Sequence, residues 1–313
     1  MTDLIFVAFI TFLNTFILLK VFQSIFLSEN IKDRINNRSS HKVIATRSGG
    51  LAIIISIFII STVYYTFNIT IYDFSLLIPV LLLGVVGLYD DVYNLDFKLK
   101  FIFQIIAAKI IIDSGLIIDN FHGIFGIYEI NRALAQVLTI FIICSIINAI
   151  NFIDGIDGLA ASIVILFISC FEFFSKYDTG LFYLSVMIIF SLIPFMFYNF
   201  RKNLKVFLGD SGSLFLGGLV SIYILKILSN DYIIESKFDM NKIIFALSIL
   251  SYPIIDFTRV ILIRLKNGNS PFFADKNHIH HILLKKYNDN HKYVVITIFS
   301  FSFLAMILIQ LFF

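Results

Sequence analysis

The sequence predicts an all-α, polytopic integral membrane protein, and three observations support this prediction. Hydrophobic residues occupy 59% of the 313 positions and charged residues only 14%, whereas soluble domains contain about 25% charged residues. The mean hydropathy is +0.92, and the apolar runs approach the ~20 residues that a helix needs to cross the hydrocarbon core. The runs do not alternate between apolar and polar residues, which excludes the short dyad-repeat strands of a membrane β-barrel.

About ten apolar segments are expected to cross the bilayer as helices, because a lipid-exposed backbone must satisfy its own polar groups. The first segment is too long for a signal peptide and lacks a basic start, so we expect it to be retained. Residues 1–313 are expected to form a single integral-membrane domain without internal repeats. The expected spans are residues 4–27, 49–68, 74–89, 99–118, 133–150, 159–175, 181–199, 212–229, 243–264 and 293–312.

The positions of Lys and Arg predict the orientation of the chain. Most of the 24 such residues follow odd-numbered spans, whereas the loops on the opposite face hold only Arg132, Lys176, Lys237 and Lys242. Short cytoplasmic loops are enriched in Lys and Arg. The loops after odd-numbered spans are therefore expected to be cytoplasmic, with both termini outside.

Acidic and imidazole side chains form four clusters, and two apolar spans separate each cluster from the next. This parity would bring all four clusters to one face of the membrane, as a shared site requires. The clusters are Asp90 with Asp91, Asp154 with Asp157, Asp210 alone, and His278 with His280 and His281.

The first cluster is a pair of adjacent carboxylates at the end of the third span. Asp90 and Asp91 repel each other unless a cation or donor lies between them, and Lys98 and Lys100 follow shortly after. A solvated helix end is the alternative interpretation. The basic residues nearby favour a functional pair.

The second cluster lies in a polar segment that contains no Lys or Arg. Asn148, Asn151, Asp154 and Asp157 are costly next to hydrocarbon unless a ligand satisfies them. Asp-Gly pairs are common in turns, but a turn does not require the two asparagines as well. A binding function is therefore favoured.

The third cluster, residues 206–213, leads from a Gly/Ser-rich loop into the eighth span. A helix N-terminus offers free N–H groups to a phosphate, and Asp210 would repel that phosphate unless a divalent cation lies between them. Mg²⁺ typically uses one or two carboxylates together with phosphate oxygens. The alternative is that Asp210 is simply a favourable acid at a helix start.

The histidines of the fourth cluster suit cationic recognition of a phosphate better than a zinc site, since no Cys accompanies them. His41, Lys42 and Arg47 form another cationic loop on the same face, with a solvated loop as the alternative. Two further sets of residues are expected to be ordinary. They are the loop residues His122 and His291, and the structural pairs Lys109 with Asp113 and Asp256 with Arg259.

Several motifs, in this order and spacing, resemble those of the polyprenyl-phosphate N-acetylhexosamine-1-phosphate transferases, glycosyltransferase family 4. They are His-Lys…Arg-x-Gly-Gly, Asp-Asp, Asn-x-x-Asn-x-x-Asp-Gly-x-Asp-Gly-Leu-Ala, Phe-Leu-Gly-Asp-x-Gly-Ser and His-x-His-His. The last motif is similar to that of the branch that primes O-antigen, enterobacterial common antigen or teichoic acid linkage units. This resemblance implies transfer of GlcNAc 1-phosphate from UDP-GlcNAc to undecaprenyl (polyprenyl) phosphate in the bacterial cytoplasmic membrane, with release of UMP.

The resemblance also implies roles for individual residues. Asp210 would hold Mg²⁺ (or Mn²⁺), Asp157 and Phe207 would engage uracil, and Asp90 or Asp91 would act on the lipid phosphate. Asn199 departs from the family pattern, because Phe200 and Arg201 follow it instead of Pro-Ala. The expected catalytic residues are Asp90, Asp91, Asp154, Asp157, His280 and His281; the expected substrate-binding residues are His41, Lys42, Arg47, Lys98, Lys100, Asn148, Asn151, Asn199, Phe207 and His278; and the expected metal ligands are Asp210 and Asp154.

Three alternatives remain open at this point. The donor could be UDP-MurNAc-pentapeptide or another UDP-N-acetylhexosamine. A membrane transporter would place acids near the bilayer midplane rather than at span ends. A phosphatidyltransferase that uses CDP-linked lipids would need an Arg after Asp157-Gly158-Leu159-Ala160, where Ala161 and Ser162 stand. No nucleic-acid partner is expected, and the oligomeric state is open, with a dimer as one alternative.

Overall fold

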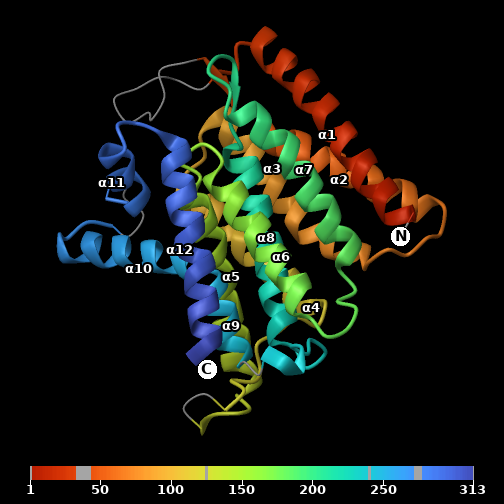
Figure 1. Ribbon diagram of the computed structural model, residues 1–313, viewed down its shortest axis with the longest axis vertical. Coiled ribbons are helices and arrows are strands. Elements are labelled where there is room, and N and C mark those ends of the chain that lie inside the picture. Colours follow the sequence, from red (N-terminus) through yellow and green to blue (C-terminus); the bar gives the residue numbers. More distant parts are fainter. Residues whose placement is uncertain (1, 33–43, 124–125, 239–240, 271–276, 313) are drawn as a thin grey trace.

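The computed structural model describes residues 2–32, 44–123, 126–238, 241–270 and 277–312, and these residues form a helical bundle (Figure 1). The all-α fold class is thereby confirmed. The helices are α1 (Thr2–Ser28), α2 (Gly49–Thr66), α3 (Leu77–Tyr93), α4 (Phe97–Asp113), α5 (Arg132–Ile153), α6 (Leu159–Phe174), α7 (Phe182–Asn199), α8 (Gly209–Leu228), α9 (Lys242–Ile249), α10 (Ser251–Lys266), α11 (Ile279–Lys286) and α12 (His291–Phe312), with short 3-10 helices at Phe74–Leu76 and Ser236–Phe238.

Every predicted span contains a helix. Within the described residues, seven helices are long and apolar enough to cross a membrane, or eight if the bent pair α9 and α10 forms one span. Helices α4 and α6 are shorter, with 17 and 16 residues. The protein is therefore polytopic, while the figure of about ten spans stays a prediction.

The ninth predicted span, residues 243–264, is not one straight helix. Helices α9 and α10 meet at Leu250 and are bent by 75°. Pro253 lies in the first turn of α10, where its ring nitrogen cannot donate a hydrogen bond back to α9. Figure 1 shows the result, because α10 lies across the bundle while α12 runs along it.

Helix α8 forms the centre of the bundle and is almost completely buried. It contacts α2, α3, α5, α6 and α9. Small residues allow these close approaches: a Cβ added to Gly50 of α2 would lie only 2.1 Å from the backbone nitrogen of Gly212. The N-terminus of α8, with Asp210, is thereby held against the ends of neighbouring helices.

Two short strands that the sequence did not predict tie two loops together at this end of the bundle. Strand β1 (Ala45–Thr46) pairs in parallel with β2 (Lys205–Val206). The pairing continues as the backbone nitrogens of Gly49 and Gly50 donate to the carbonyls of Phe207 and Leu208. Arg47 and Lys205 are thus positioned beside the acids described below.

Candidate active site

Acids from two helices meet around one lysine. The Nζ atom of Lys100 in α4 lies 2.9 Å from Oδ2 of Asp90 in α3 and 2.9 Å from Oδ2 of Asp210 in α8. Asp90 also accepts a hydrogen bond from the backbone nitrogen of Leu95 at 2.5 Å. A positive charge between two carboxylates relieves their repulsion. The sequence predicted a cation or donor between Asp90 and Asp91, and Lys100 instead lies between Asp90 and Asp210.

Asp91 caps helix α8. Its two carboxylate oxygens accept hydrogen bonds from the backbone nitrogens of Asp210 at 2.9 Å and Ser211 at 3.0 Å. A carboxylate here is favourable because the helix N-terminus carries partial positive charge. Asp91 occupies these two N–H groups, so they are not free for a phosphate. Arg47 approaches the same carboxylate, with its Nη1 atom 3.7 Å from Oδ1 of Asp91.

The two asparagines of α5 face this centre. Asn151 donates to Oδ1 of Asp210 at 3.3 Å and to the hydroxyl of Ser213 at 2.8 Å. Asn148 is buried and pairs its amide with that of Gln104 at 2.8 Å. Both asparagines border a cavity of about 220 Å³, lined also by Leu95, Phe97, Lys100, Gln104, Phe152 and Leu214.

Asp154 lies in the turn between α5 and α6 and adds a further carboxylate. Burial raises the pKa of Asp154 well above its usual range, and Asp210, Asp91 and Asp157 raise this pKa further, while Arg47 opposes them. These three carboxylates therefore lie close enough to Asp154 to disfavour its ionised form. A divalent cation would relieve this repulsion.

Asp157 has two basic partners that the sequence did not reveal. Lys205 forms an ion pair with its carboxylate, and Nδ1 of His291 lies 3.1 Å from its Oδ2 atom. Burial alone would raise the pKa of Asp157, but His291 and Lys205 outweigh this effect and lower the pKa. The prediction that His291 is an ordinary loop residue is therefore wrong.

Asn199 joins the turn that contains Asp157 to the strand that contains Val206 by two hydrogen bonds. Its Oδ1 atom accepts a hydrogen bond from the backbone nitrogen of Gly158 at 2.6 Å, and its Nδ2 donates to the carbonyl of Val206 at 2.8 Å. The side chain is buried, and its role in substrate binding stays a prediction. Phe207, which follows Val206, is half-buried.

The histidine cluster begins helix α11. Nδ1 of His278 lies 2.6 Å from Oδ2 of Asp256, and Nδ1 of His280 lies 3.0 Å from the hydroxyl of Tyr252. The predicted pairing of Asp256 with Arg259 is wrong, since Arg259 donates to the carbonyl of Asn277.

The remaining histidines approach the turn that carries Asp154. The ring of His281 lies 4.4 Å from that of His280, measured between centroids. A Cβ on Gly155 would lie 3.2 Å from Nε2 of His280 and 3.5 Å from Cε1 of His281. The fourth cluster thus faces the second.

Some predicted residues do not join this arrangement. His41 and Lys42 lie outside the described residues. Lys98 is exposed, and two residues before Lys100 on a helix it faces a different direction. Two structural expectations are met away from the candidate site. They are the ion pair of Lys109 with Asp113 and the loop residue His122, whose Nε2 lies 2.9 Å from the carbonyl of Leu228.

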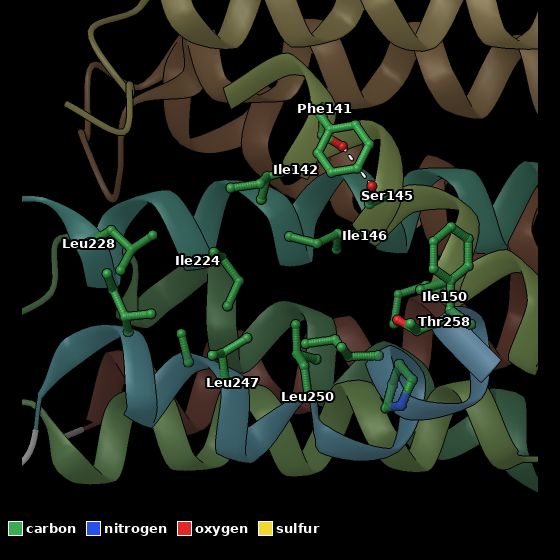
Figure 2. Close-up of a pocket in the computed structure, with 16 residues that line it drawn as sticks. Phe141, Ile142, Ser145, Ile146, Ile150, Ile224, Leu228, Leu247, Leu250 and Thr258 are labelled. Atoms are coloured by element: carbon green, nitrogen blue, oxygen red, sulfur yellow. Dashed lines mark hydrogen bonds between the residues drawn. The ribbon is translucent and has the colours of Figure 1, made fainter. Parts of the chain in front are cut away.

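An apolar groove lies on the other side of α5, at the bend between α9 and α10. Its volume is about 360 Å³, and its lining is almost entirely aliphatic or aromatic. Figure 2 shows Ile146 and Ile150 of α5 projecting into the same space as Leu247 and Leu250. The last turns of α5 therefore separate a polar cavity from an apolar groove.

Comparisons with known proteins identify the family of the chain. Residues 73–228 match the family model "Glycosyl transferase family 4". The chain is 34% identical to a probable undecaprenyl-phosphate N-acetylglucosaminyl 1-phosphate transferase of Bacillus subtilis, over 96% of this chain and 83% of the relative. It is 30% identical to the undecaprenyl-phosphate alpha-N-acetylglucosaminyl 1-phosphate transferase of Haemophilus influenzae, over 88% and 78% of the two chains.

A third relative has another lipid in its name. The chain is 31% identical to the decaprenyl-phosphate N-acetylglucosaminephosphotransferase of Mycobacterium leprae, over 68% of this chain and 58% of the relative. The region that matches the family model, residues 73–228, contains Asp90, Asp91, Asp154, Asp157 and Asp210. The protein belongs to glycosyl transferase family 4.

Proposed function

We propose that the protein transfers N-acetylglucosamine 1-phosphate from UDP-GlcNAc to a membrane-anchored polyprenyl phosphate and releases UMP. The observation that carries this proposal is the convergence of acids at one end of the bundle, beside an apolar groove. Lys100 bridges Asp90 and Asp210, Asp91 caps the N-terminus of α8, and Asp154 lies close enough to Asp210 and Asp91 for their charges to raise its pKa. The names of the relatives describe the same transfer. The distribution of Lys and Arg supports a cytoplasmic location of this end.

The donor set fits Mg²⁺, which prefers oxygen ligands and typically binds one or two carboxylates together with substrate phosphates. Asp210 and Asp154 would hold it, since the two carboxylates lie close enough for Asp210 to raise the pKa of Asp154. Mn²⁺ has the same preference for oxygen ligands. When bound, the cation would supply positive charge to the phosphates during transfer.

The chemistry requires little proton transfer by the protein. The second pKa of a phosphate monoester is about 6, so the acceptor is largely a dianion at neutral pH. One of its oxygens attacks the β-phosphorus, a new P–O bond forms, and the bond to the bridging oxygen breaks with its electron pair leaving on UMP. Asp90 and Asp91 already bind Lys100 and the α8 N-terminus, so their role in this scheme is to position cations and backbone.

The apolar groove provides a place for the isoprenoid tail of the acceptor. Ser145 and Thr258 are the polar residues in its lining, and the hydroxyl of Ser145 is satisfied by the carbonyl of Phe141 at 2.7 Å. Burying hydrocarbon here would contribute roughly 25 cal/mol per Å² of apolar surface. The acceptor phosphate would then reach the polar cavity around the end of α5.

A bulky side chain in the groove is expected to weaken binding of the lipid without affecting the nucleotide sugar. Ala246 is buried in the groove wall, and Ala246→Phe would occupy part of its volume. We expect KM for a long-chain polyprenyl phosphate to rise about tenfold, which corresponds to about 1.4 kcal/mol of lost binding. Ala133→Phe is the matched control on exposed α5 surface, and equal changes in KM for UDP-GlcNAc would contradict the assignment.

Mg²⁺ is expected to raise the Tm of the purified protein, and the increase should grow with pH. Because folding raises the pKa of Asp154, folded protein holds this proton more tightly than unfolded chain. The contribution of Asp154 to stability is therefore fully present below the ordinary pKa of Asp and is lost as pH rises through the raised pKa. The cation binds the ionised form and restores this stability.

Thermal unfolding with and without Mg²⁺ across this pH range tests the expectation. Asp154→Asn should weaken the pH dependence and remove most of the Mg²⁺ effect. Asp231→Asn, which changes an exposed carboxylate beside Lys226, should keep both. If Mg²⁺ did not change the Tm of the wild type at any pH, Asp154 would be excluded as a ligand of Mg²⁺.

A panel of donors tests the proposed function directly. Purified protein is incubated with polyprenyl phosphate, Mg²⁺ and one UDP-sugar at a time, including UDP-GlcNAc and UDP-MurNAc-pentapeptide. We expect UMP and a lipid-linked sugar diphosphate with UDP-GlcNAc. No UMP from any donor, together with uptake into sealed vesicles, would favour a transporter instead.

A further inference from the structure

A buried polar cluster lies where α10 meets α11, outside the acidic centre. Asp256 and His280 are completely buried, and His278 and Arg264 are nearly so. Oδ1 of Asp256 accepts a hydrogen bond from the backbone nitrogen of Ile279 at 2.7 Å, and Oδ2 lies 2.6 Å from Nδ1 of His278. A buried carboxylate is costly unless it is paired in this way. Asp256 thus joins the start of α11 to α10.

The partners of His278 determine which ring nitrogen carries its proton. An ionised carboxylate can only accept a hydrogen bond, so Nδ1 of His278 is the donor to Asp256. Nη2 of Arg264 lies 3.4 Å from Nε2 of His278, and a guanidinium can only donate. Both contacts favour the Nδ1–H tautomer. The edge of the His278 ring packs against Phe152, with ring centroids 5.5 Å apart.

His280 has a polar atom aimed at the acidic centre. Its Nδ1 is 3.0 Å from the hydroxyl of Tyr252, whereas its Nε2 is buried without a hydrogen-bond partner among the described residues. A Cβ on Gly155 would lie 3.2 Å from this Nε2. Burial lowers the pKa of His280 well below its usual value, and the neighbouring histidines add to this effect, so the ring is neutral.

A metal ion is the competing explanation for these residues. Ligand atoms of Asp256, His278 and His280 all lie within 4.8 Å of one another. A metal ion would have to replace the proton between Asp256 and His278, and its charge would lie close to the guanidinium of Arg264. Both requirements disfavour metal binding and favour a hydrogen-bonded cluster.

We infer that Asp256 is a positioning residue: it fixes the tautomer of His278 and the start of α11, and thereby holds Nε2 of His280 against the Asp154–Gly155 turn. With the hydroxyl of Tyr252 donating to Nδ1, Nε2 of His280 carries the proton and points it at the Asp154–Gly155 turn. This inference rests on the proposed function. Asp256 itself does not touch the substrate.

Asp256→Asn separates this role from a purely structural one. The variant keeps the shape of the side chain and an oxygen for the nitrogen of Ile279. Its amide donates to Nδ1 of His278, which moves the proton to Nε2, where it faces the donors of Arg264. We expect kcat for UMP release to fall ~10- to 100-fold, as when a residue that orients an active-site imidazole is changed. Asp113→Asn, on the exposed ion pair with Lys109, should leave kcat unchanged.

Nitrogen-15 spectroscopy of protein labelled only at its six histidines reports the tautomer directly. The His278 signals, assigned with His278→Gln, should show Nδ1–H in the wild type and Nε2–H in Asp256→Asn. Wild-type kcat in this variant, or lost activity with an unchanged tautomer, would overturn the inference. Stoichiometric Zn²⁺ binding that shifts both His278 and His280 would also overturn it.

If Asp256→Asn does not fold, the spectrum of the wild type still tests the inference. An Nε2–H form of His278 in the wild type would contradict the role of Asp256. Failure of the proposed function gives a different result. Wild-type protein would then release no UMP, while the spectrum would still report the tautomer.

Discussion

Replacing Asp210 by asparagine is expected to lower the rate of UMP release by about 10²- to 10³-fold, the loss that follows removal of one charge-stabilising group from an active site. Asp210 is the carboxylate on which the cluster converges. Lys100 and Asn151 donate to its two oxygens, and its backbone nitrogen donates to Asp91. Asparagine keeps an acceptor for Asn151 and the backbone bond, so the fold is retained while the negative charge is lost.

The measurement is kcat for UMP release as a function of Mg²⁺ concentration. Asp210→Asn should need more Mg²⁺ and still remain slow at saturation. Asp231→Asn is the matched control, because it removes an exposed carboxylate near the far end of the same helix. Wild-type kcat and Mg²⁺ dependence in Asp210→Asn would remove this residue from the site.

Replacing Gly87 by alanine is expected to cause the largest loss of stability among single-methyl additions in α3. The new Cβ would lie 2.2 Å from the carbonyl oxygen of Asp210 and 2.5 Å from the backbone nitrogen of Ser211. These are backbone atoms, so α3 and α8 must separate, at a cost of about 1–3 kcal/mol. Separation also moves Asp91, one turn further along α3, away from the α8 N-terminus that it caps.

Gly84→Ala is the matched control for this prediction. Its Cβ would come within 2.7 Å of only one atom, Cδ1 of Ile54, which is the end of a flexible side chain. Thermal unfolding and kcat are measured for both variants. Gly87→Ala should lower Tm and activity together, and Gly84→Ala should change both much less. Equal effects in the two variants would contradict the close packing of α3 on α8.

The helices themselves were predictable because each apolar segment is long and its composition is uniform. The bend between α9 and α10 was not. A proline within a helix is an ambiguous signal: Pro253 accompanies the break at Leu250, whereas Pro194 lies inside α7, which continues as one helix from Phe182 to Asn199. Whether a helix breaks depends on the packing of neighbouring elements, which composition does not reveal.

The acids of the candidate site were predictable from parity and motif spacing, but their partners were not. Lys205 and His291 lie 48 and 134 residues from Asp157, and in the sequence Lys205 resembles any cytoplasmic loop lysine. Local spacing was misleading at Asp256, where a residue three positions away suggested a pair, but the buried carboxylate contacts His278, 22 residues away. Tertiary packing decided these contacts.

In the proposed reaction, the β-phosphate of the nucleotide is transferred to the lipid together with the sugar. UDP-GlcNAc labelled with ³²P in the β-phosphate, supplied with polyprenyl phosphate to the purified protein, tests it most directly. We expect the label to enter the lipid together with GlcNAc while unlabelled UMP is released. Release of labelled UDP, with a lipid that carries the sugar alone, would contradict it.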